Sequence, residues 1–447
     1  MSDTAPRKLS LFDTTLFVMG GIIGVGIFFT PSQAAAAAFE PWAFLTIWVV
    51  GGLIAMCAAF TFAELGASLP RTGGWFVYLR EGFGPFPAFL FAWIVLFIVS
   101  TGAIATMATF CANMLHVALP AVVGGDGSLS HGVAATALIL FVTAIALSGV
   151  KRAALAQNAC MVVKLLAILA LTLGGLVFFT PGAAGEAAVT PAAPAEGGSL
   201  LRGMLAALLP VFYSYGGWQM VGYLAPQVEH PERNLPRAIV MGVGGVIVVY
   251  LAVNLSYLAV LGIDGVAASP DFAAAVARVT FGPTGERVLA AGMAVSALGV
   301  CAVTIIATPW LYVAMASEGL FFESVARLHP RTAVPARALA LQAVLALIYL
   351  YAGTLQYLVG AVVFVEWIFH GAVAAALIYM RRSRPTLARP YASPLYPLAP
   401  GVYFLAACVV VISTFWTSSW TLWSTGSVIV VVGSIVYRPW RRLVAAR

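Results

Sequence analysis

The chain has little charge for its length. Of its 447 residues only 9% are Asp, Glu, Lys or Arg, whereas 62% are hydrophobic, and the mean hydropathy is +0.99. An ordinary soluble domain is about 25% charged, because its surface faces water. The low charge therefore excludes a soluble domain as the main body of the protein and indicates a chain that lies in a lipid bilayer.

The sequence also lacks the residue clusters that catalysis or metal binding requires. Its five cysteines, none in a C-x-x-C pair, lie in or near apolar stretches, and its five histidines are scattered. Buried thiols at such places usually act as small apolar packing side chains. Since no nucleophile lies beside a base and no Cys/His pattern suggests a metal site, we expect no enzyme activity, no cofactor and no metal.

What the sequence does contain is a series of long apolar stretches. Each has the roughly 18 or more residues that a helix needs to cross a hydrocarbon core about 30 Å thick. They cover about residues 12–38, 42–67, 85–117, 132–150, 158–180, 203–228, 237–262, 285–317, 336–353, 357–380, 396–415 and 420–437. We therefore predict an all-α integral membrane protein with twelve transmembrane helices.

Basic residues are unevenly shared between the two sides of these spans. If the N-terminus is cytoplasmic, 19 of the 23 Lys and Arg residues lie on the inner side, three lie outside, and Lys164 lies within a span. Such a bias is typical of the cytoplasmic side of membrane proteins. We expect both termini in the cytoplasm, and the net charge of +7 then reports topology rather than a nucleic-acid partner.

Two of the spans are interrupted by glycine-rich segments. The first runs from Gly20 to Phe28 and the second from Tyr213 to Trp218, five spans later. Gly20 and Gly24 are four residues apart, which also suits close helix packing. Matching breaks in two halves of a chain, however, are typical of transporters built from inverted repeats. We predict a substrate site near the membrane midplane where both breaks meet.

The polarity of a broken helix favours one kind of ligand. Free N–H groups at one half-helix favour a carboxylate, and free carbonyl groups at the other favour an ammonium group. An α-amino acid carries both groups. A channel would need a polar path with filter elements, and a polyamine would need several acidic pocket residues, for which Glu366 is the one candidate. An amino acid fits best, with polyamines or other amines as the alternative.

Four parts of the sequence resemble the signature segments of one superfamily. They are Ile22 to Pro31; Phe62 to Gly66 with Pro70 to Gly74 and Tyr78 to Glu81; Tyr215 to Trp218 with His230 to Pro236; and Ser317 to Gly319. Through them nearly the whole chain resembles the amino acid–polyamine–organocation superfamily, in particular the L-type amino-acid transporters and their bacterial relatives. The resemblance implies a LeuT-type fold with two inverted repeats of five helices and with helices 1 and 6 broken.

The resemblance also implies domain boundaries and a location. Residues 1–11 would form a cytoplasmic N-terminus, 12–195 the first repeat, 196–381 the second repeat, and 382–447 the last two helices with a cytoplasmic C-terminus. The protein would span a plasma membrane, the inner membrane if the source is bacterial.

Carried over at matching positions, the resemblance implies a set of substrate-binding residues. The N–H groups of Val25 and Gly26 would bind the carboxylate, and carbonyl groups of Ile22, Ile23 and a residue near Tyr213 would bind the amine. The full set is Ile22, Ile23, Gly24, Val25, Gly26, Tyr213, Gly216 and Trp218. Val25 departs from the small hydroxyl residue that the family often has there, so the cavity loses a donor and becomes narrower.

Four ionisable residues are candidates for coupling or gating. The resemblance implies that Lys164 takes the place of a sodium ion beside the broken first helix, although its side chain could also reach water at the inner surface. Glu366 and His370 lie one turn apart, as a proton-coupling or a structural pair. Glu64 would contact a basic loop residue such as Arg71 at the inner side, or be solvated there.

These features together predict a sodium-independent secondary transporter of neutral L-amino acids, working by alternating access as an exchanger or facilitator. The alternative is a proton-coupled symporter of amino acids, polyamines or other amines. The family's animal members pair with a glycoprotein through a cysteine in the loop after the third span. Here that loop, Leu119 to His131, has no cysteine, so we expect no disulfide-linked heavy subunit, and the expected partners are the substrate and the bilayer.

Overall fold

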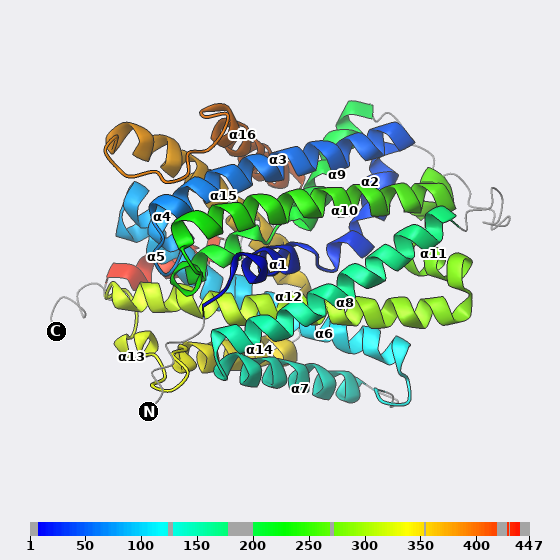
Figure 1. Ribbon diagram of the computed structural model, residues 1–447, viewed down its shortest axis with the longest axis horizontal. Coiled ribbons are helices and arrows are strands. Elements are labelled where there is room, and N and C mark those ends of the chain that lie inside the picture. Colours follow the sequence, from blue (N-terminus) through cyan, green and yellow to red (C-terminus); the bar gives the residue numbers. More distant parts are fainter. Residues whose placement is uncertain are drawn as a thin grey trace.

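The computed structural model describes residues 8–123, 128–177, 200–268, 272–352, 355–417, 427–428 and 430–438. Over these residues the regular structure is helical, apart from an isolated bridge between Leu9 and Val228. Five described helical stretches are long and apolar enough to cross a membrane, namely Pro41–Ser68, Pro85–Ala118, Val150–Val177, Pro231–Ala268 and Thr284–Ser317. Many of the helices run along the long axis of the molecule (Figure 1).

Nineteen labelled helical elements are described along the chain. In order they are α1 (Leu11–Ile22), η1 (Gly26–Phe28), α2 (Thr30–Ala38), α3 (Pro41–Ser68), α4 (Trp75–Phe83), α5 (Pro85–Ile94), η2 (Val95–Val99), α6 (Ser100–Ala118), α7 (Ser128–Leu147), α8 (Val150–Val177), α9 (Leu200–Tyr215), η3 (Trp218–Gln227), α10 (Pro231–Ala268), α11 (Phe272–Phe281), α12 (Pro283–Ser317), α13 (Glu323–Ala326), α14 (Ala336–Ala352), α15 (Leu355–Ser383) and α16 (Leu398–Thr417).

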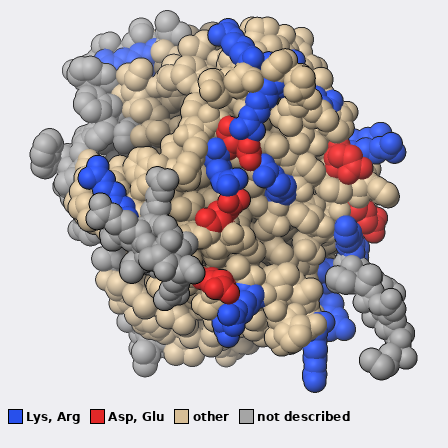
Figure 2. All heavy atoms as spheres, turned by 90° about the vertical axis from the view of Figure 1, so that its left-hand side faces the viewer, with Lys and Arg blue, Asp and Glu red and all other residues tan. Residues whose placement is uncertain are grey.

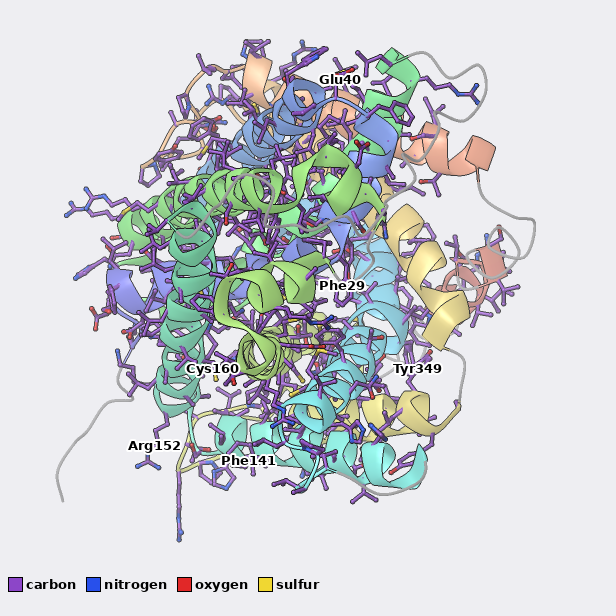
Figure 3. The ribbon with its side chains drawn as sticks, turned by 90° about the vertical axis from the view of Figure 1, so that its right-hand side faces the viewer. Phe29, Glu40, Phe141, Arg152, Cys160 and Tyr349 are labelled. Carbon is purple, nitrogen blue, oxygen red and sulfur yellow. The ribbon has the colours of Figure 1, made fainter. Side chains whose placement is uncertain are left out.

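The first apolar stretch is two helices separated by a break. Helix α1 starts at a capping box, in which the Ser10 side chain accepts from the Asp13 backbone and Asp13 accepts from the Ser10 N–H. It ends at Ile22, and α2 begins only at Thr30 after the single turn η1. At the far end of this break the Phe29 ring, labelled in Figure 3, packs edge-on against Phe110 of α6 with ring centroids 5.4 Å apart.

The sixth apolar stretch is interrupted in a similar way. Helix α9 ends at Tyr215, and the chain resumes in η3 at Trp218. Gly217, between them, has a φ of +119°, which favours glycine. A Cβ atom built on Gly217 would lie 2.2 Å from the Gly21 carbonyl oxygen, so the two breaks touch each other through bare backbone.

Several helix boundaries differ from those that hydropathy predicts. Helix α8 begins at Val150, eight residues before the predicted start of its span, because the polar residues of its first turns bind partners at the end of the bundle. Asn158 Nδ2 donates to Asp13 Oδ1 at 3.1 Å, and Lys151 pairs with the other oxygen of the same carboxylate. Helices α4, α11 and α13 are short elements outside the predicted spans. Of the predicted span 420–437, residues 420–426 and 429 lie outside the described residues, and the described remainder is helical.

Glu64 has a different partner from the one that the sequence suggests. Its carboxylate is fully buried and accepts from Arg381 at 2.6 and 2.8 Å, with Arg389 Nε at 3.4 Å and the Ser393 N–H at 2.8 Å. The expected contact with Arg71 was wrong, because α15 and the segment after it pack over the end of α3. The Glu64 side chain is therefore buried in a group of Arg contacts rather than solvated.

Arg71 instead belongs to an ion-pair group on the same end of the molecule. It pairs with Glu81 at 2.5 Å, and Arg384 pairs with the other Glu81 oxygen. Burial opposes ionisation of the Glu81 carboxyl, but the hydrogen bonds from Arg71 and Arg384 outweigh it and hold its pKa below the usual value. Figure 2 looks onto this end of the bundle and shows Lys and Arg side chains gathered there among fewer acidic ones.

Candidate functional site

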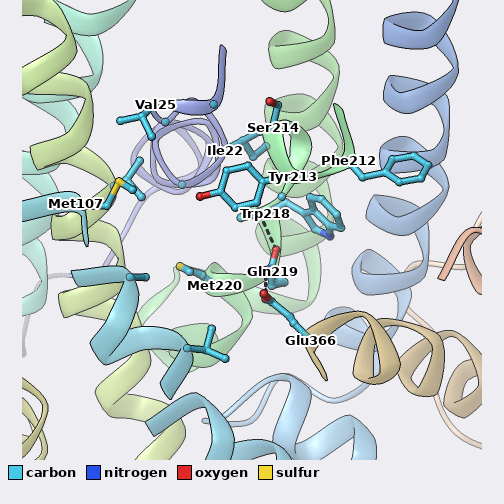
Figure 4. Close-up of a pocket in the computed structure, with 18 of the residues that line it drawn as sticks. Ile22, Val25, Met107, Phe212, Tyr213, Ser214, Trp218, Gln219, Met220 and Glu366 are labelled. Atoms are coloured by element: carbon cyan, nitrogen blue, oxygen red, sulfur yellow. Dashed lines mark hydrogen bonds between the residues drawn. The ribbon is translucent and has the colours of Figure 1, made fainter. Parts of the chain in front are cut away.

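A cavity of about 210 Å³ lies where the two breaks meet (Figure 4). The first break contributes Gly21, Ile22, Gly24, Val25 and Gly26, and the second contributes Phe212, Tyr213, Ser214, Gly216, Gly217, Trp218, Gln219 and Met220. The rest of the lining comes from η2, α6, α12 and α15, including Glu366, Trp367 and His370. The wall is mostly apolar with a few polar groups, as is usual for small-molecule sites.

The first break leaves backbone donors free while its carbonyl groups are occupied. Neither the Val25 nor the Gly26 N–H has a hydrogen-bond partner within the described ranges. By contrast, the carbonyl oxygen of Ile22 accepts from Tyr250 at 3.1 Å, and that of Gly24 accepts from Ser296 at 3.2 Å. Unpaired donors beside a cavity attract an anion.

Lys164 holds the third carbonyl of this break. Its side chain, 1% exposed, donates from Nζ to the Ile23 carbonyl oxygen. A Cβ atom built on Gly299 of α12 would lie 3.4 Å from Nζ, so the ammonium group is wedged between α1 and α12. Ile23 itself is fully buried and lies behind the cavity wall, as does Lys164. The Lys164 amino group thus binds backbone oxygen outside the space that a ligand would fill.

The second break satisfies its N–H groups from within its own segment. The Gly217 N–H donates to Gln219 Oε1 at 2.9 Å, which fixes the orientation of the Gln219 amide. Its Nε2 then faces Glu366 Oε1 at 3.5 Å, and His370 Nε2 lies 4.0 Å from the same oxygen. In Figure 4 the dashed lines trace this path from the break through Gln219 to Glu366.

His370 is set in an aromatic cage beside the cavity. Its Nδ1 shares a hydrogen bond with the Tyr403 hydroxyl of α16. The rings of Trp75, Trp218 and Trp367 lie within 4.6 to 5.9 Å of it, centroid to centroid. The cage fixes the ring one turn from Glu366 and joins α4, η3, α15 and α16.

Tyr250 of α10 is a connecting residue that the sequence does not single out. Its buried hydroxyl lies 3.1 Å from both the Ile22 and the Ser214 carbonyl oxygens, one in each break. One hydroxyl carries one proton, so the two carbonyl groups share it. Since a tyrosine in an apolar span usually packs as a core residue, only the folded arrangement identifies this contact.

A π-helical turn in the third span also faces the cavity. η2, Val95–Val99, interrupts the helix between α5 and α6, and Val99 lines the cavity. The Ser100 hydroxyl donates to the Val95 carbonyl at 2.8 Å and so supports the widened turn. Such turns are frequent at functional sites, but nothing in the sequence locates this one.

Most of the expected site residues lie around one space, and some do not. Ile22, Gly24, Val25, Gly26, Tyr213, Gly216 and Trp218 line the cavity together with Glu366 and His370. Ile23 and Lys164 lie behind the wall, and Glu64 lies at the end of the bundle. Residues that the sequence did not predict for the site include Gly21, Ser214, Gln219, Met220 and Trp367.

Helical spans with a small internal cavity between two broken helices define the class of a multi-pass membrane transporter. Residues 9–436 match the amino acid permease family, and because the match covers nearly the whole chain, the chain belongs to this family, within the amino acid–polyamine–organocation superfamily. Its relatives are transporters, so the chain is an amino acid transporter rather than an enzyme.

Three relatives show how far the similarity extends. The b(0,+)-type amino acid transporter 1 of Mus musculus is 29% identical over 419 residues, which are 92% of this chain and 81% of the relative. The serine/threonine exchanger SteT of Bacillus subtilis is 28% identical over 416 residues, 92% of each chain. The large neutral amino acids transporter small subunit 2 of Mus musculus is 29% identical over 444 residues, 96% of this chain and 80% of the relative.

Proposed function

We propose that this chain is a sodium-independent secondary transporter of neutral L-amino acids that works by alternating access as an exchanger or facilitator. The observation that carries the proposal is that both breaks line one cavity, with free N–H groups at Val25 and Gly26. These groups suit the α-carboxylate of a bound amino acid. The name of the Bacillus subtilis relative, an exchanger of two neutral amino acids, supports the same assignment.

The α-amino group would bind carbonyl oxygens of the two breaks. The carbonyl oxygens of Ile22 and Tyr213 each accept one bond, from Tyr250 at 3.1 Å and from the Gly216 N–H at 3.3 Å. Each keeps a second lone pair that an ammonium group can use. The Ile23 carbonyl, which the sequence places in this role, faces Lys164 instead. Tyr213 and Trp218 would flank the substrate, and Gly216 would leave room for its side chain.

Sodium independence is supported by the position of Lys164. A fixed ammonium group on the Ile23 carbonyl supplies the positive charge that a sodium ion would otherwise bring to a broken helix. Transport by this chain would therefore need no sodium gradient.

For the architecture we propose the LeuT-type arrangement of twelve spans. Residues 12–195 and 196–381 would be the inverted repeats, and 382–447 would hold the last two helices. The breaks after α1 and α9 support it, because each falls in the first span of its repeat. We further propose that residues 1–11 and the C-terminus are cytoplasmic and that the membrane is a plasma membrane, the inner one in a bacterium.

A second candidate function rests on Glu366. A carboxyl group in the cavity wall, one turn from His370, could carry a proton during transport or attract an amine. The chain would then be a proton-coupled symporter of amino acids, polyamines or other amines.

We also propose that the chain works without a disulfide-linked heavy subunit. The large neutral amino acids transporter of Mus musculus is named a "small subunit", but that name describes the relative and says nothing of this chain. Here Cys111, the cysteine nearest the loop after the third span, is buried and donates to the Ala294 carbonyl at 3.2 Å. Protein from native membranes should run at the same mass on reducing and non-reducing gels, and a heavier band that collapses on reduction would contradict this.

Counterflow in liposomes that contain only the purified protein tests the main proposal. Liposomes preloaded with neutral amino acids should take up a labelled one at nearly the same rate when sodium is replaced by choline. A large fall in choline would contradict sodium independence. Uptake into empty liposomes that requires an inward proton gradient would favour the symporter alternative.

A further inference from the structure

Glu366 is the one carboxylate among the described residues that line the cavity, and it faces no Lys or Arg there. Its side chain is 27% exposed. A carboxylate has room for about four hydrogen bonds. Oε1 has the long contact from Gln219 at 3.5 Å and His370 at 4.0 Å, and Oε2 has no partner within the described ranges. The group therefore offers unused acceptor capacity to whatever fills the cavity.

Gln219 adds the complementary group. Because its Oε1 already accepts the Gly217 N–H, its Nε2 is turned toward Glu366 and carries two N–H donors. At 3.5 Å the contact with Glu366 Oε1 is at the outer limit of a hydrogen bond. The pair thus presents an acceptor and a donor side by side.

We propose that Glu366 and Gln219 form a side-chain subsite that selects amino acids whose side chain ends in a hydrogen-bond donor. This inference rests on the proposed amino-acid site and specifies which neutral substrates it favours. With the α-carboxylate at Val25 and Gly26, the substrate side chain extends past Tyr213 toward Glu366, which Figure 4 shows on the side of the cavity away from Val25.

Hydroxyl and carboxamide side chains match this subsite better than an ammonium group does. A hydroxyl or carboxamide can donate to Glu366 and accept from Gln219, so both protein groups are satisfied. An ammonium group can also donate to Glu366, but it has no acceptor for the Gln219 N–H. A purely apolar side chain would leave the two groups with only their long mutual contact, so that Glu366 Oε2 and the second Gln219 Nε2–H would face it without partners, which is costly away from water.

Pairs of substrates with equal shape test the proposal without any mutation. Threonine and valine differ by a hydroxyl in place of a methyl group, and asparagine and leucine by a carboxamide in place of a branched alkyl end. A site that bonds a substrate donor rejects the analogue without it far more strongly than an apolar pocket distinguishes a methylene. In counterflow, threonine and asparagine should compete at least about tenfold better than valine and leucine.

Two variants test whether Glu366 and its partner Gln219 cause this preference. Glu366→Leu should bring the threonine-to-valine ratio close to one while valine still exchanges. The control is Glu323→Leu, which removes an exposed carboxylate on α13 and should keep the wild-type ratio. If Glu366→Leu does not fold, Gln219→Met should also reduce the ratio, since it removes the donor of the pair.

Each other outcome overturns a defined part of the proposal. Equal competition by threonine and valine in the wild-type protein, or an unchanged ratio in Glu366→Leu, would rule out the subsite. If lysine competes better than glutamine, the subsite prefers a cation and the choice of neutral donors is wrong. If no amino acid exchanges at all, the proposed function itself fails.

Discussion

At the first break, side chains of neighbouring helices bind the carbonyl groups that the interrupted helix leaves exposed. At the second break, several backbone groups find partners within the same segment. Tyr250, Lys164 and Ser296 hold the carbonyls of Ile22, Ile23 and Gly24 from α10, α8 and α12. The Gly217 N–H is instead capped by Gln219, two residues along the same chain. These contacts satisfy the carbonyl groups of the first break and the Gly217 N–H within the apolar bundle, whereas the Val25 and Gly26 N–H groups have no partner among the described residues.

This difference indicates separate roles for the two breaks. At the first break acceptors are filled from outside and the N–H groups of Val25 and Gly26 remain, so it favours the charged carboxylate end of a ligand. At the second break the backbone is mostly self-satisfied, and side chains such as Tyr213 and Gln219 face the cavity. The first break would recognise what all amino acids share, and the second would distinguish them.

The largest expected effect comes from Gly217, where the two breaks touch. Gly217→Ala would place a Cβ atom 2.2 Å from the Gly21 carbonyl oxygen at a φ of +119°. The strain alone is worth about 1–3 kcal/mol, and the clash adds to it. We expect little folded protein by size-exclusion chromatography. Gly216→Ala is the matched control, because its Cβ would meet nothing closer than 3.4 Å; equal yields for both variants would contradict this contact.

Removal of the ammonium group at the first break should stop transport without unfolding the protein. Lys164→Ala leaves the buried Ile23 carbonyl without its donor and opens a gap beside Gly299. We expect counterflow to fall by roughly fivefold to more than a hundredfold, since a loss of about 1–3 kcal/mol at this group corresponds to that range. Arg152→Ala, an exposed cation on the same helix, labelled in Figure 3, is the control and should transport normally. Normal transport by Lys164→Ala would show that transport does not need Lys164.

A smaller effect is expected from the hydroxyl that joins the breaks. Tyr250→Phe removes a donor that the Ile22 and Ser214 carbonyls share, at a cost of about 1–3 kcal/mol. The melting temperature should fall by a few degrees. Tyr257→Phe, on the same helix, removes a buried hydroxyl that has no hydrogen-bond partner among the described residues and should leave stability unchanged or raised. A reversed order of the two melting temperatures would show that Tyr250 does not hold the breaks together.

The smallest expected effect is at the self-capped break. Gln219→Met removes the acceptor of the Gly217 N–H, a hydrogen bond worth about 1 kcal/mol. The melting temperature should fall less than in Tyr250→Phe, because only one backbone group loses its partner. A larger fall than in Tyr250→Phe would mean that the second break depends on Gln219 more than the first depends on α10.

The sequence predicts the breaks well, because glycine clusters inside apolar stretches leave a helix few alternatives. It also predicts nine of the residues that line the cavity, seven of them beside a break, but none of the lining that comes from η2, α6 and α12. It fails where a contact joins distant segments, as for Tyr250 between the two breaks, or for Glu64 with Arg381 rather than Arg71. Hydropathy also misses the start of α8, since polar residues of its first turns such as Lys151 and Asn158 lower the local hydropathy, and their contacts with Asp13 cannot be read from the sequence.

The central claim, that the two breaks form one site for a complete α-amino acid, is tested most directly by blocking each end of the ligand. Counterflow of a labelled neutral amino acid should be inhibited by the same unlabelled amino acid, and poorly by its α-carboxamide and its N-acetyl derivative. The account predicts that both derivatives lose at least about tenfold in competition, because each lacks one charged partner of the broken backbone. If the amide or the acetylated compound competes as well as the amino acid, or if a polyamine competes better than any neutral amino acid, the assignment of this site is wrong.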